Sequence, residues 1–304
     1  FGIAIMYLKG VFPAFAWIIG NIIAVPAMGL FIRYVPASSY WTKFKSLAMP
    51  LFALYLFVEY FAMIINLNGA KAVLSGKIGM SLDGSVKVLS YPFIESNIAL
   101  VAVILAGVGF VWFINRWGLK GSVLTDVWQY VIQLGAVVVL ALASIMLGGA
   151  QPVPLEAYQP GGSDWALFGF LGIFFGAFGA GHQWQRLTSV PKKDAFKAGL
   201  WSGFFFGLYM VFVLLTAAFF VQNSLFISIL MLVILLTVAS STVDSTIAGM
   251  QFVTQKIGLG PRWGSFLALM AICSWPFMAG MGVLGAWSFM AAWRWKIVLT
   301  AIVI

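Results

Sequence analysis

Long apolar runs, separated by short polar stretches, dominate the amino-acid sequence. Nine of these runs are long enough to cross the hydrocarbon core of a bilayer as helices, which takes about 20 residues each. A membrane β-barrel would instead show alternating apolar and polar positions in segments of about ten residues. The pattern therefore predicts an all-α, polytopic helical membrane protein with about nine transmembrane helices, at residues 11–32, 47–69, 96–115, 122–148, 165–181, 199–221, 225–252, 263–282 and 284–304.

The composition of the chain agrees with this interpretation. Hydrophobic residues make up 62% of the 304 positions and charged residues only 8%, whereas a soluble domain carries about 25% charged residues. The single cysteine, Cys273, excludes an intrachain disulfide, and the single histidine, His182, excludes a zinc or haem site built from several histidines of one chain. We recognise no nucleophile–base pair and no phosphate-binding loop, so we expect neither an enzyme nor a resident cofactor.

Basic residues gather on alternate loops between the predicted spans. One set of loops holds eleven Lys and Arg residues, and the opposite set holds four. Because the cytoplasmic loops of membrane proteins carry the excess of basic residues, we expect the first set to be cytoplasmic and the protein to lie in the plasma (cytoplasmic or inner) membrane. These loops account for the net charge of +9, so we expect a lipid bilayer, and no nucleic acid, as a partner. The predicted cytoplasmic loops are residues 33–47, 116–121, 186–197 and 256–262.

Ionisable residues inside the predicted spans are candidate functional groups, because charge in the hydrocarbon is costly. Asp126 opens the fourth span, and Gln129 follows on the same helical face. Asp126 could also be a water-facing acid that complements the helix dipole. Glu59, in the middle of the second span, could bind a solute or a proton, or could pair with a basic residue that the sequence does not identify. His182, at the cytoplasmic end of the fifth span, is expected to be a solvated boundary residue.

The seventh predicted span is rich in hydroxyl side chains. Ser241, Asp244 and Ser245 share one helical face, with Thr242 beside them. So many hydroxyls cannot all face lipid, and they must line a helix interface or a polar cavity. Hydroxyl and carboxylate oxygens can replace the hydration shell of a hard monovalent cation. The carboxylate of Asp244 favours ion binding, and interhelical packing by small hydroxyl residues is the alternative.

Glycines recur along the fifth predicted span, and they include Gly176, Gly179 and Gly181. Glycine weakens a helix by about 1 kcal/mol per residue relative to alanine. In a membrane this cost is compatible with close packing of helices. It is also compatible with a discontinuous helix whose freed backbone groups bind a substrate. The spacing of the glycines suits either interpretation.

Three stretches of the sequence resemble motifs of the sodium:solute symporter family. Residues 118–129 (GLKGSVLTDVWQ) resemble the family's cytoplasmic loop and the Thr-Asp-Val-x-Gln start of the following helix. Residues 183–186 (QWQR), followed by a lysine-rich stretch, resemble its Gln-Arg loop. Residues 241–245 (STVDS) are similar to its Ser-Thr-x-Asp-Ser sodium motif. The three motifs occur in the family's order and separation, and the resemblance extends over most of the chain.

The resemblance implies the LeuT-like fold of that family, an inverted five-plus-five helix repeat. One transmembrane domain would cover residues 1–304, with the first repeat at 1–148, incomplete at its N-terminus, and the second at 165–304. The first core helix would be missing from this chain or reduced to residues 1–10. The fifth span lacks the Asn-Gln pair of the sugar-transporting branch, and His182 stands where an acid is frequent. The resemblance therefore does not imply a sugar as the solute.

The resemblance also implies roles for individual residues. Ser241 and Thr242 would supply hydroxyls to the main sodium site, and Asp126, Ser241 and Ser245 would form a second one. Asp244 matches the acid of the motif. The coupling ion would be Na⁺, with no other metal, and a small polar solute would bind near the membrane midplane. The candidate residues for the solute are Glu59, Gly176, Gly179, Gly181 and Gln129.

We therefore expect a secondary active transporter that couples the sodium gradient to the uptake of a small polar organic solute by alternating access. Two alternatives stay open. The chain could be a non-transporting membrane sensor or interaction module with the same fold. It could also be a proton-coupled transporter that uses Glu59 or Asp126.

Overall fold

The structure is a computed structural model of the chain, and it describes residues 9–35, 49–75, 93–147, 156–158, 161–219 and 225–278. All regular secondary structure in these ranges is helical, which confirms the predicted all-α class. The elements are α2 (Val11–Tyr34), α4 (Met49–Leu74), α5 (Ser96–Leu147), α6 (Gly162–Phe178), α7 (Gly181–Ser189), the 3₁₀ turn η1 (Lys192–Asp194), α8 (Ala195–Ala218), α9 (Leu225–Lys256) and α10 (Pro261–Met278).

Several helices have the length and composition of membrane spans. Five in the described residues are long and apolar enough to cross a bilayer, namely Val11–Tyr34, Tyr55–Leu74, Ser96–Leu147, Lys192–Ala218 and Leu225–Lys256. The pair α6 and α7 would make a sixth span, bent by 51°. The chain is therefore a membrane-embedded helical protein, as predicted. Helix α10 occupies the eighth predicted span as far as Met278, and the ninth, residues 284–304, lies outside the described residues.

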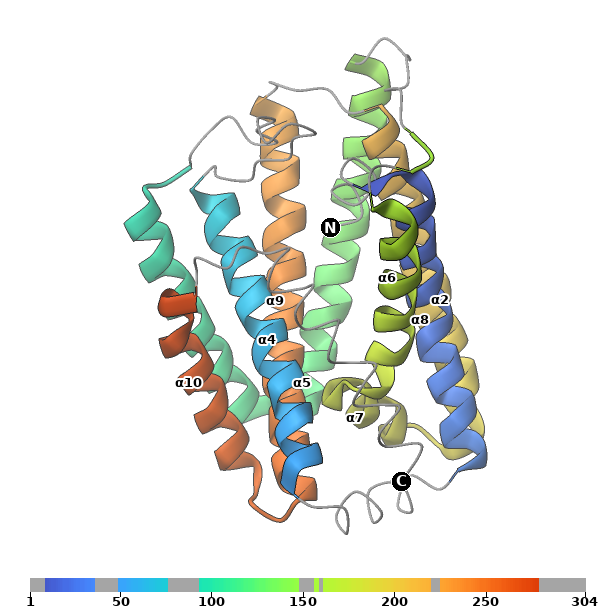
Figure 1. Cartoon of the computed structure of the whole chain (residues 1–304). Helices are drawn as coiled ribbons and strands as arrows, with labels where there is room; N and C mark the ends of the chain where they lie inside the picture. Colours follow the sequence, from blue (N-terminus) through green and yellow to red (C-terminus); the bar gives the residue numbers. More distant parts are fainter. Residues whose placement is uncertain are drawn as a thin grey trace.

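Helix α5 contains two of the predicted spans within one run of 52 residues. Its backbone leaves helical geometry at Gly118, where φ is 56° and ψ is −147°, a conformation open to glycine because it has no Cβ atom. Figure 1 shows that the first leg, residues 96–117, descends to this bend and that the second leg, residues 119–147, climbs from it. The predicted loop at residues 116–121 is helical apart from Gly118, so the chain reverses at a single glycine.

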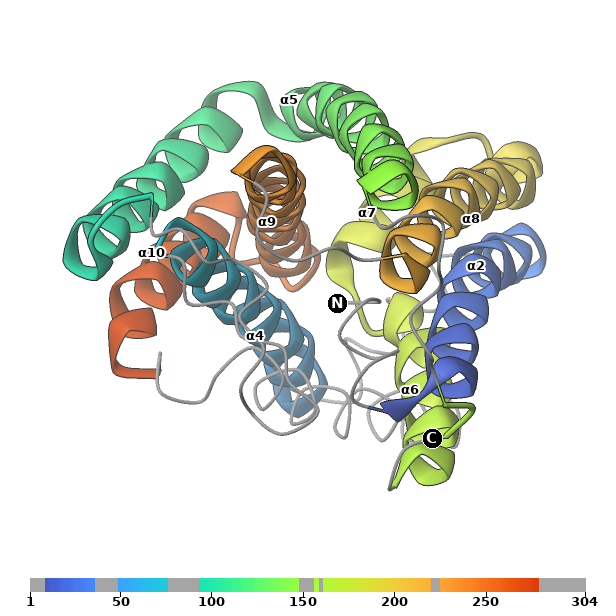
Figure 2. The same cartoon turned by 90° about the horizontal axis from the view of Figure 1, so that it is seen from above.

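The helices form two groups that meet around α7 and α9 (Figure 2). Helix α2 packs against α6 and α8, whereas α4, α5 and α10 pack against α9. The core between α4, the first leg of α5, α9 and α10 contains the fully buried side chains of Met63, Ile114, Ile247 and Trp275. A second core surrounds the fully buried Trp184 of α7 and includes residues of α2, α4 and α9. The short helix α7 is therefore in contact with both groups.

Polar side chains inside the bundle pair with one another across helices. Asn115 Oδ1, on the first leg of α5, accepts hydrogen bonds from Gln251 Nε2 of α9 at 2.9 Å and from Ser265 Oγ of α10 at 2.5 Å. Trp275 Nε1 of α10 donates to Asn68 Oδ1 of α4 at 2.6 Å. Such interhelical hydrogen bonds stabilise membrane bundles, because lipid offers no alternative partner. They connect α4, α5, α9 and α10 into one rigid group.

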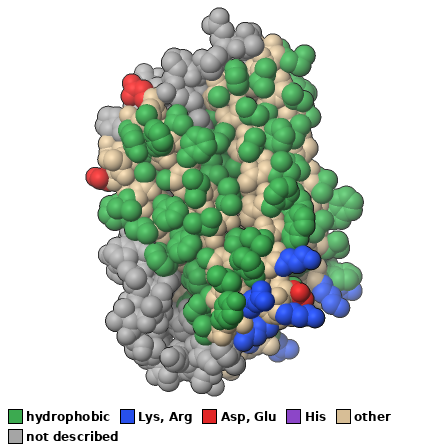
Figure 3. All heavy atoms as spheres, turned by 90° about the vertical axis from the view of Figure 1, so that its right-hand side faces the viewer, with side chains coloured by type: hydrophobic (Ala, Val, Ile, Leu, Met, Phe, Trp, Pro, Cys, Tyr) green, Lys and Arg blue, Asp and Glu red, His purple; other side chains and the backbone are tan. Residues whose placement is uncertain are grey.

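Apolar side chains cover the flanks of the bundle, as expected for a surface that faces lipid. Large hydrophobic residues such as Leu105, Trp112 and Met146 are more than half exposed. Figure 3 shows hydrophobic side chains over most of one flank and Lys and Arg side chains gathered toward one end of it. In Figure 1 the end of α2, the bend of α5, the end of α7 and the turn between α9 and α10 all lie at the same lower end. The described parts of the four basic loops thus share one side of the bundle, which we call the basic end.

Candidate functional site

Helices α6 and α7 form one discontinuous helix. Helix α6 ends at Phe178 and α7 begins at Gly181, and Ala180 between them is extended, with φ −106° and ψ 116°. The last carbonyls of a helix have no partner within it. Here the Phe178 carbonyl oxygen accepts hydrogen bonds from the Tyr55 hydroxyl at 2.6 Å and from Trp184 Nε1 at 2.8 Å. Side chains from α4 and α7 therefore satisfy the backbone at the break, which is what a break within the membrane requires.

Two glycines bring α7 close to α9 beside this break. A Cβ atom on Gly181 would lie 2.6 Å from Val253 Cγ2. A Cβ atom on Gly249 would lie 2.6 Å from Glu59 Oε1 and 2.9 Å from the backbone nitrogen of His182. A side chain at either position would therefore push α7, α9 or Glu59 out of place. The sequence left open whether the glycines serve close packing or a discontinuous helix. The structure has both: the helix is interrupted between α6 and α7, and α7 lies close to α9 beside the break.

Glu59 fills the space beside these glycines and contacts the first turn of α7. Its carboxylate accepts hydrogen bonds from the His182 backbone N–H at 3.2 Å and from His182 Nδ1, which lies 3.1 Å from Oε1 and 3.3 Å from Oε2. Glu59 is fully buried, and the His182 side chain is 15% exposed. His182 is therefore the partner of Glu59 that the sequence could not identify. It is not the solvated boundary residue that was predicted, because its ring is turned inward onto a carboxylate at the start of α7.

Arg186 lies one turn after His182 on α7 and also points into the bundle. Its Nη2 atom donates hydrogen bonds to Asp126 Oδ2, with which it forms an ion pair, and to Ser245 Oγ at 2.6 Å. The two charged side chains are partly buried, with 29% of Arg186 and 19% of Asp126 exposed. The sequence placed Arg186 in a cytoplasmic loop that starts at residue 186. The structure corrects this placement, because α7 continues to Ser189 and directs Arg186 toward α5 and α9.

Asp126 and Asp244 are the two carboxylates of a polar cluster between the second leg of α5 and α9. Ser241 Oγ donates to Asp126 Oδ1 at 2.6 Å. Thr125 Oγ1 donates to Asp244 Oδ2 at 2.5 Å, and Asp244 is fully buried. The Ser245 hydroxyl lies 2.6 Å from the Ser241 carbonyl oxygen and 3.2 Å from Asp244 Oδ1. We call these five residues and Arg186 the Asp126–Asp244 cluster.

The cluster lies within the membrane-spanning part of both helices. Asp126 comes eight residues after Gly118, which places it about 12 Å along the helix from the bend at the basic end. Asp244 comes twelve residues before Lys256, the last residue of α9, or about 18 Å from that end. The hydrocarbon core is about 30 Å thick. Both carboxylates are nearer the basic end of their helical leg than its opposite end, at Leu147 for α5 and Leu225 for α9.

The remaining predicted site residues lie outside the cluster. Thr242 Oγ1 donates to the Val238 carbonyl oxygen of its own helix at 3.1 Å. Gln129 Nε2 donates to Ser240 Oγ at 2.9 Å, at the interface of α5 and α9 rather than at the break of α6 and α7. Gly176, which is buried, and Gly179 form the end of α6 at that break. Of the predicted sodium ligands, the structure thus brings together Asp126, Ser241, Asp244 and Ser245.

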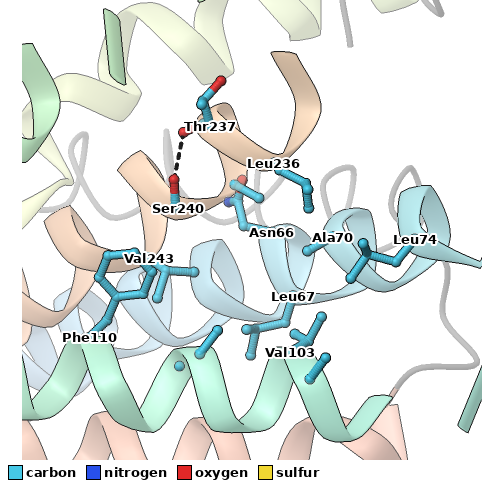
Figure 4. Close-up of a pocket in the computed structure, with 14 residues that line it drawn as sticks. Asn66, Leu67, Ala70, Leu74, Val103, Phe110, Leu236, Thr237, Ser240 and Val243 are labelled. Atoms are coloured by element: carbon cyan, nitrogen blue, oxygen red, sulfur yellow. Dashed lines mark hydrogen bonds between the residues drawn. The ribbon is translucent and has the colours of Figure 1, made fainter. Parts of the chain in front are cut away.

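A cavity of about 400 Å³ lies between α4, the first leg of α5 and α9 (Figure 4). Asn66, Thr237 and Ser240 supply polar groups on one side, and apolar residues such as Leu67 and Phe110 line the other. The Ser240 hydroxyl donates to the Thr237 carbonyl oxygen at 3.0 Å. Ser240 directly precedes the hydroxyl residues of the Asp126–Asp244 cluster on α9. The cavity therefore lies next to the cluster, and no sequence pattern indicated it.

Three residues of these contacts were not assigned a functional role from the sequence. Thr125 and Arg186 both lie within stretches that resemble the family's motifs, but Asp126 and Gln129 were the residues singled out there. His182 and Arg186 are four residues apart, so they share a helical face, which is the signal that could have connected them. Their partners, Glu59 and Asp126, lie on other helices and are far away in the sequence. Spacing alone could not identify such pairs.

The resemblance to the sodium:solute symporter family stays a prediction from the three sequence motifs. No family model, no curated protein and no solved structure matches the chain.

Proposed function

We propose that the protein is a secondary active transporter that couples the sodium gradient to symport of a small polar organic solute by alternating access. The observation that carries this proposal is the Asp126–Asp244 cluster, in which carboxylates and hydroxyls from α5 and α9 converge inside the membrane. Oxygen atoms of this kind are the ligands that hard cations take in place of water. The predicted motif residues Ser241 and Ser245 turn toward Asp126 and Asp244 and not toward lipid.

The charges of the cluster favour a bound cation. Asp126 and Asp244 carry two carboxylates, and Arg186 supplies one positive charge, which it places on Asp126. Among the described residues, the side chains that bond Asp244 are the hydroxyls of Thr125 and Ser245. A carboxylate in the hydrocarbon is costly without a counter-charge. A sodium ion held by Asp244, Ser245 and Asp126 would supply that charge.

In the structure, the guanidinium of Arg186 occupies the position beside Asp126 that a bound sodium ion would take. Its guanidinium contacts both Asp126 and Ser245, which are two of the proposed sodium ligands. Sodium binding to both of these residues therefore requires Arg186 to withdraw, and α7 carries Arg186. Because α7 is the second half of a discontinuous helix, its movement would connect the ion site to the break. This connection is the physical basis that we propose for coupling.

The solute site is proposed at the break of α6 and α7, where discontinuous helices of transporters expose backbone groups. Glu59, Gly176, Gly179 and Gly181 lie there, whereas Gln129 lies at the ion site. The break also opens the proposed second repeat, residues 165–304 of an inverted five-plus-five fold. The basic end would face the cytoplasm across the inner or plasma membrane. A non-transporting sensor with the same fold would use the same ion and solute contacts without flux.

The first test is sodium binding and transport by the purified full chain. We expect saturable ²²Na⁺ binding in detergent, and sodium-gradient-driven uptake in proteoliposomes of at least one solute from a radiolabelled panel of amino acids, organic acids and polyols. Ser241→Ala combined with Ser245→Ala should weaken ²²Na⁺ binding by about tenfold or more, which is about 1.4 kcal/mol. The matched control is Thr216→Ala on α8, whose hydroxyl donates to the Phe212 carbonyl oxygen of its own helix.

Two outcomes would contradict the proposal. Sodium binding that is absent in the wild type, or unaffected by the double substitution, would reject the ion site. Sodium and solute binding without flux in proteoliposomes would favour the sensor. Thr242→Ala tests the main sodium site that the resemblance implies. Because Thr242 bonds the Val238 carbonyl oxygen, an effect as large as that of the double substitution requires its hydroxyl to turn toward the ion.

A further inference from the structure

Helix α7 carries the basic side chains that contact Glu59 and Asp126. His182, in its first turn, contacts Glu59 of α4, and Arg186, four residues later, contacts Asp126 of α5. The helix has only nine residues, Gly181–Ser189, and it follows directly on the break. Two side-chain contacts to carboxylates, one turn apart, therefore connect it to α4 and α5. A movement of α7 that loosens one of these contacts also loosens the other.

The two contacts of α7 concern different carboxylates. Sodium at Asp126 and Ser245 would take the place of the Arg186 guanidinium, which the structure places on both residues. It would not serve Glu59, whose ionisable contact among the described residues is His182. A fully buried carboxylate without a counter-charge is strongly unfavourable, so a proton on the imidazole would strengthen the contact between α7 and α4.

The surroundings of Glu59 keep its carboxylate in contact with His182. Its carboxylate lies against Gly249 and Gly181, where no side chain would leave it room. It accepts two hydrogen bonds from one residue, from the backbone N–H and from Nδ1 of His182. Both donors are at the start of a helix, where the dipole favours a negative charge. These contacts hold the Glu59 carboxylate against the first turn of α7.

We propose that Glu59 and His182 together bind one proton, and that this proton and the sodium ion at Asp126 oppose each other through α7. This inference rests on the proposed sodium-coupled function. With the proton bound, the ion pair of imidazolium and carboxylate holds α7 on α4, and α7 holds Arg186 on Asp126. Loss of the Nε2 proton to water leaves Nδ1 bonded to Glu59, but the carboxylate loses its counter-charge and the contact weakens. Arg186 then leaves Asp126, and sodium takes its place.

The charged groups around His182 limit what else could titrate. Apart from Glu59, the charged groups of the contacts described above are Arg186 on α7 itself, Asp126 on α5 and Asp244 on α9. Helix α7 also packs against α2, α6 and α8, and η1 follows it in the chain. On α6 the acid is Asp164, in the first turn and far from the break. The charged residues of the other packed elements lie at the basic end, and they are Arg33, Lys192, Lys193, Asp194, Lys197 and Lys256.

The test measures ²²Na⁺ binding to the purified full chain at about pH 6 and about pH 8.5, because histidine is the side chain whose charge commonly changes in this range. The wild type should bind sodium about fivefold or more tightly at the higher pH, the low end of typical coupling between two sites. His182→Gln keeps a hydrogen-bond donor but cannot hold the proton, so it should bind sodium equally at both pH values. Glu59→Gln should do the same. The matched control, Asp164→Asn, removes an exposed acid and should behave as the wild type.

The result that would overturn the proposal is a His182→Gln protein that keeps the wild-type pH dependence, because Asp126 or Asp244 would then be the group that titrates. A wild type whose sodium binding does not depend on pH would overturn it as well. A wild type that binds no sodium at either pH would reject the sodium function, and the opposition between proton and sodium with it. The first two outcomes leave the sodium function intact, so the two failures are distinguishable.

Hydrogen–deuterium exchange of α7 gives a second measurement that requires no variant. If the proton holds α7 in place, the amides of residues 181–189 should exchange faster at the higher pH, after correction for the intrinsic effect of pH on exchange. Selective ¹⁵N labelling of histidine then reports the protonation of His182 directly, because the chain has one histidine. Equal corrected exchange at both pH values, or an imidazole that stays neutral at the lower pH, would overturn the proton site.

Discussion

Arg186 and Asp126 lie sixty residues apart in the sequence and form an ion pair inside the helix bundle. The pair connects α7, the second half of a discontinuous helix, to the carboxylate cluster between α5 and α9. Arg186 also donates a hydrogen bond to Ser245, so it contacts both helices that form the cluster. A group that displaced Arg186 from Asp126 would therefore remove one of the contacts that hold α7 in position.

The stability of this pair can be measured with a double-mutant cycle. Removing one partner of a fully buried ion pair costs about 3–5 kcal/mol, because the other charge is left uncompensated. Arg186 and Asp126 are 29% and 19% exposed, so we expect a smaller cost of about 1–3 kcal/mol for Arg186→Gln or Asp126→Asn. The double variant should be more stable than the sum of the single effects indicates. Thermal unfolding in detergent checks this prediction, and strictly additive effects would contradict it.

The close approach of α9 to Glu59 predicts that Gly249→Ala is destabilising. The added Cβ atom would lie 2.6 Å from Glu59 Oε1, and overpacking of this kind costs about 1–3 kcal/mol. Gly135 on the second leg of α5 is the matched control, because a Cβ atom there meets nothing within 4 Å. Gly135→Ala should be neutral or stabilising by up to about 1 kcal/mol. Equal unfolding temperatures for the two variants would contradict the packing described here.

The reversal of α5 predicts a different cost at Gly118. A Cβ atom at this position meets nothing within 4 Å, so the cost comes from the backbone alone. With φ at 56° and ψ at −147°, Gly118→Ala should be destabilising by about 1–3 kcal/mol. Gly109, on the first leg, has equally open surroundings and lacks a positive φ. Gly109→Ala should therefore not destabilise the protein, and thermal unfolding of the two variants compares them directly.

The orientation of the protein can be tested by cysteine labelling. The single cysteine, Cys273, is exposed and is first replaced by serine. Asp164→Cys and Lys193→Cys then place one thiol at each end of the bundle, and both positions are exposed. If the basic end is cytoplasmic, a membrane-impermeant maleimide should label Asp164→Cys in intact cells, and Lys193→Cys only after permeabilisation. The reverse pattern would invert the proposed topology.

The sequence predicted the helices well and their contacts incompletely. Continuous apolar runs placed the spans, since each run reports directly on its own burial in lipid. Ser241 and Ser245 of the STVDS motif lie within hydrogen-bond distance of the Asp126 and Asp244 carboxylates. Its second residue, Thr242, was grouped with the others, but its hydroxyl bonds the Val238 carbonyl oxygen. Hydroxyl residues in helices commonly make this bond to the preceding turn, and the motif alone cannot show which of its hydroxyls does so.

The amino-acid sequence by itself determined that this chain is a helical membrane protein, which of its ends is basic, and which residues in its spans are costly to bury. These properties are local, because each depends on the composition of one segment. The tertiary structure decided that Glu59 meets His182, that Arg186 turns inward to Asp126, and that one short helix carries both contacts. Such pairings depend on how helices from distant parts of the chain pack together. Glycines such as Gly249 allow this close packing, but the pattern of hydrophobic and polar residues does not show which helices they bring together.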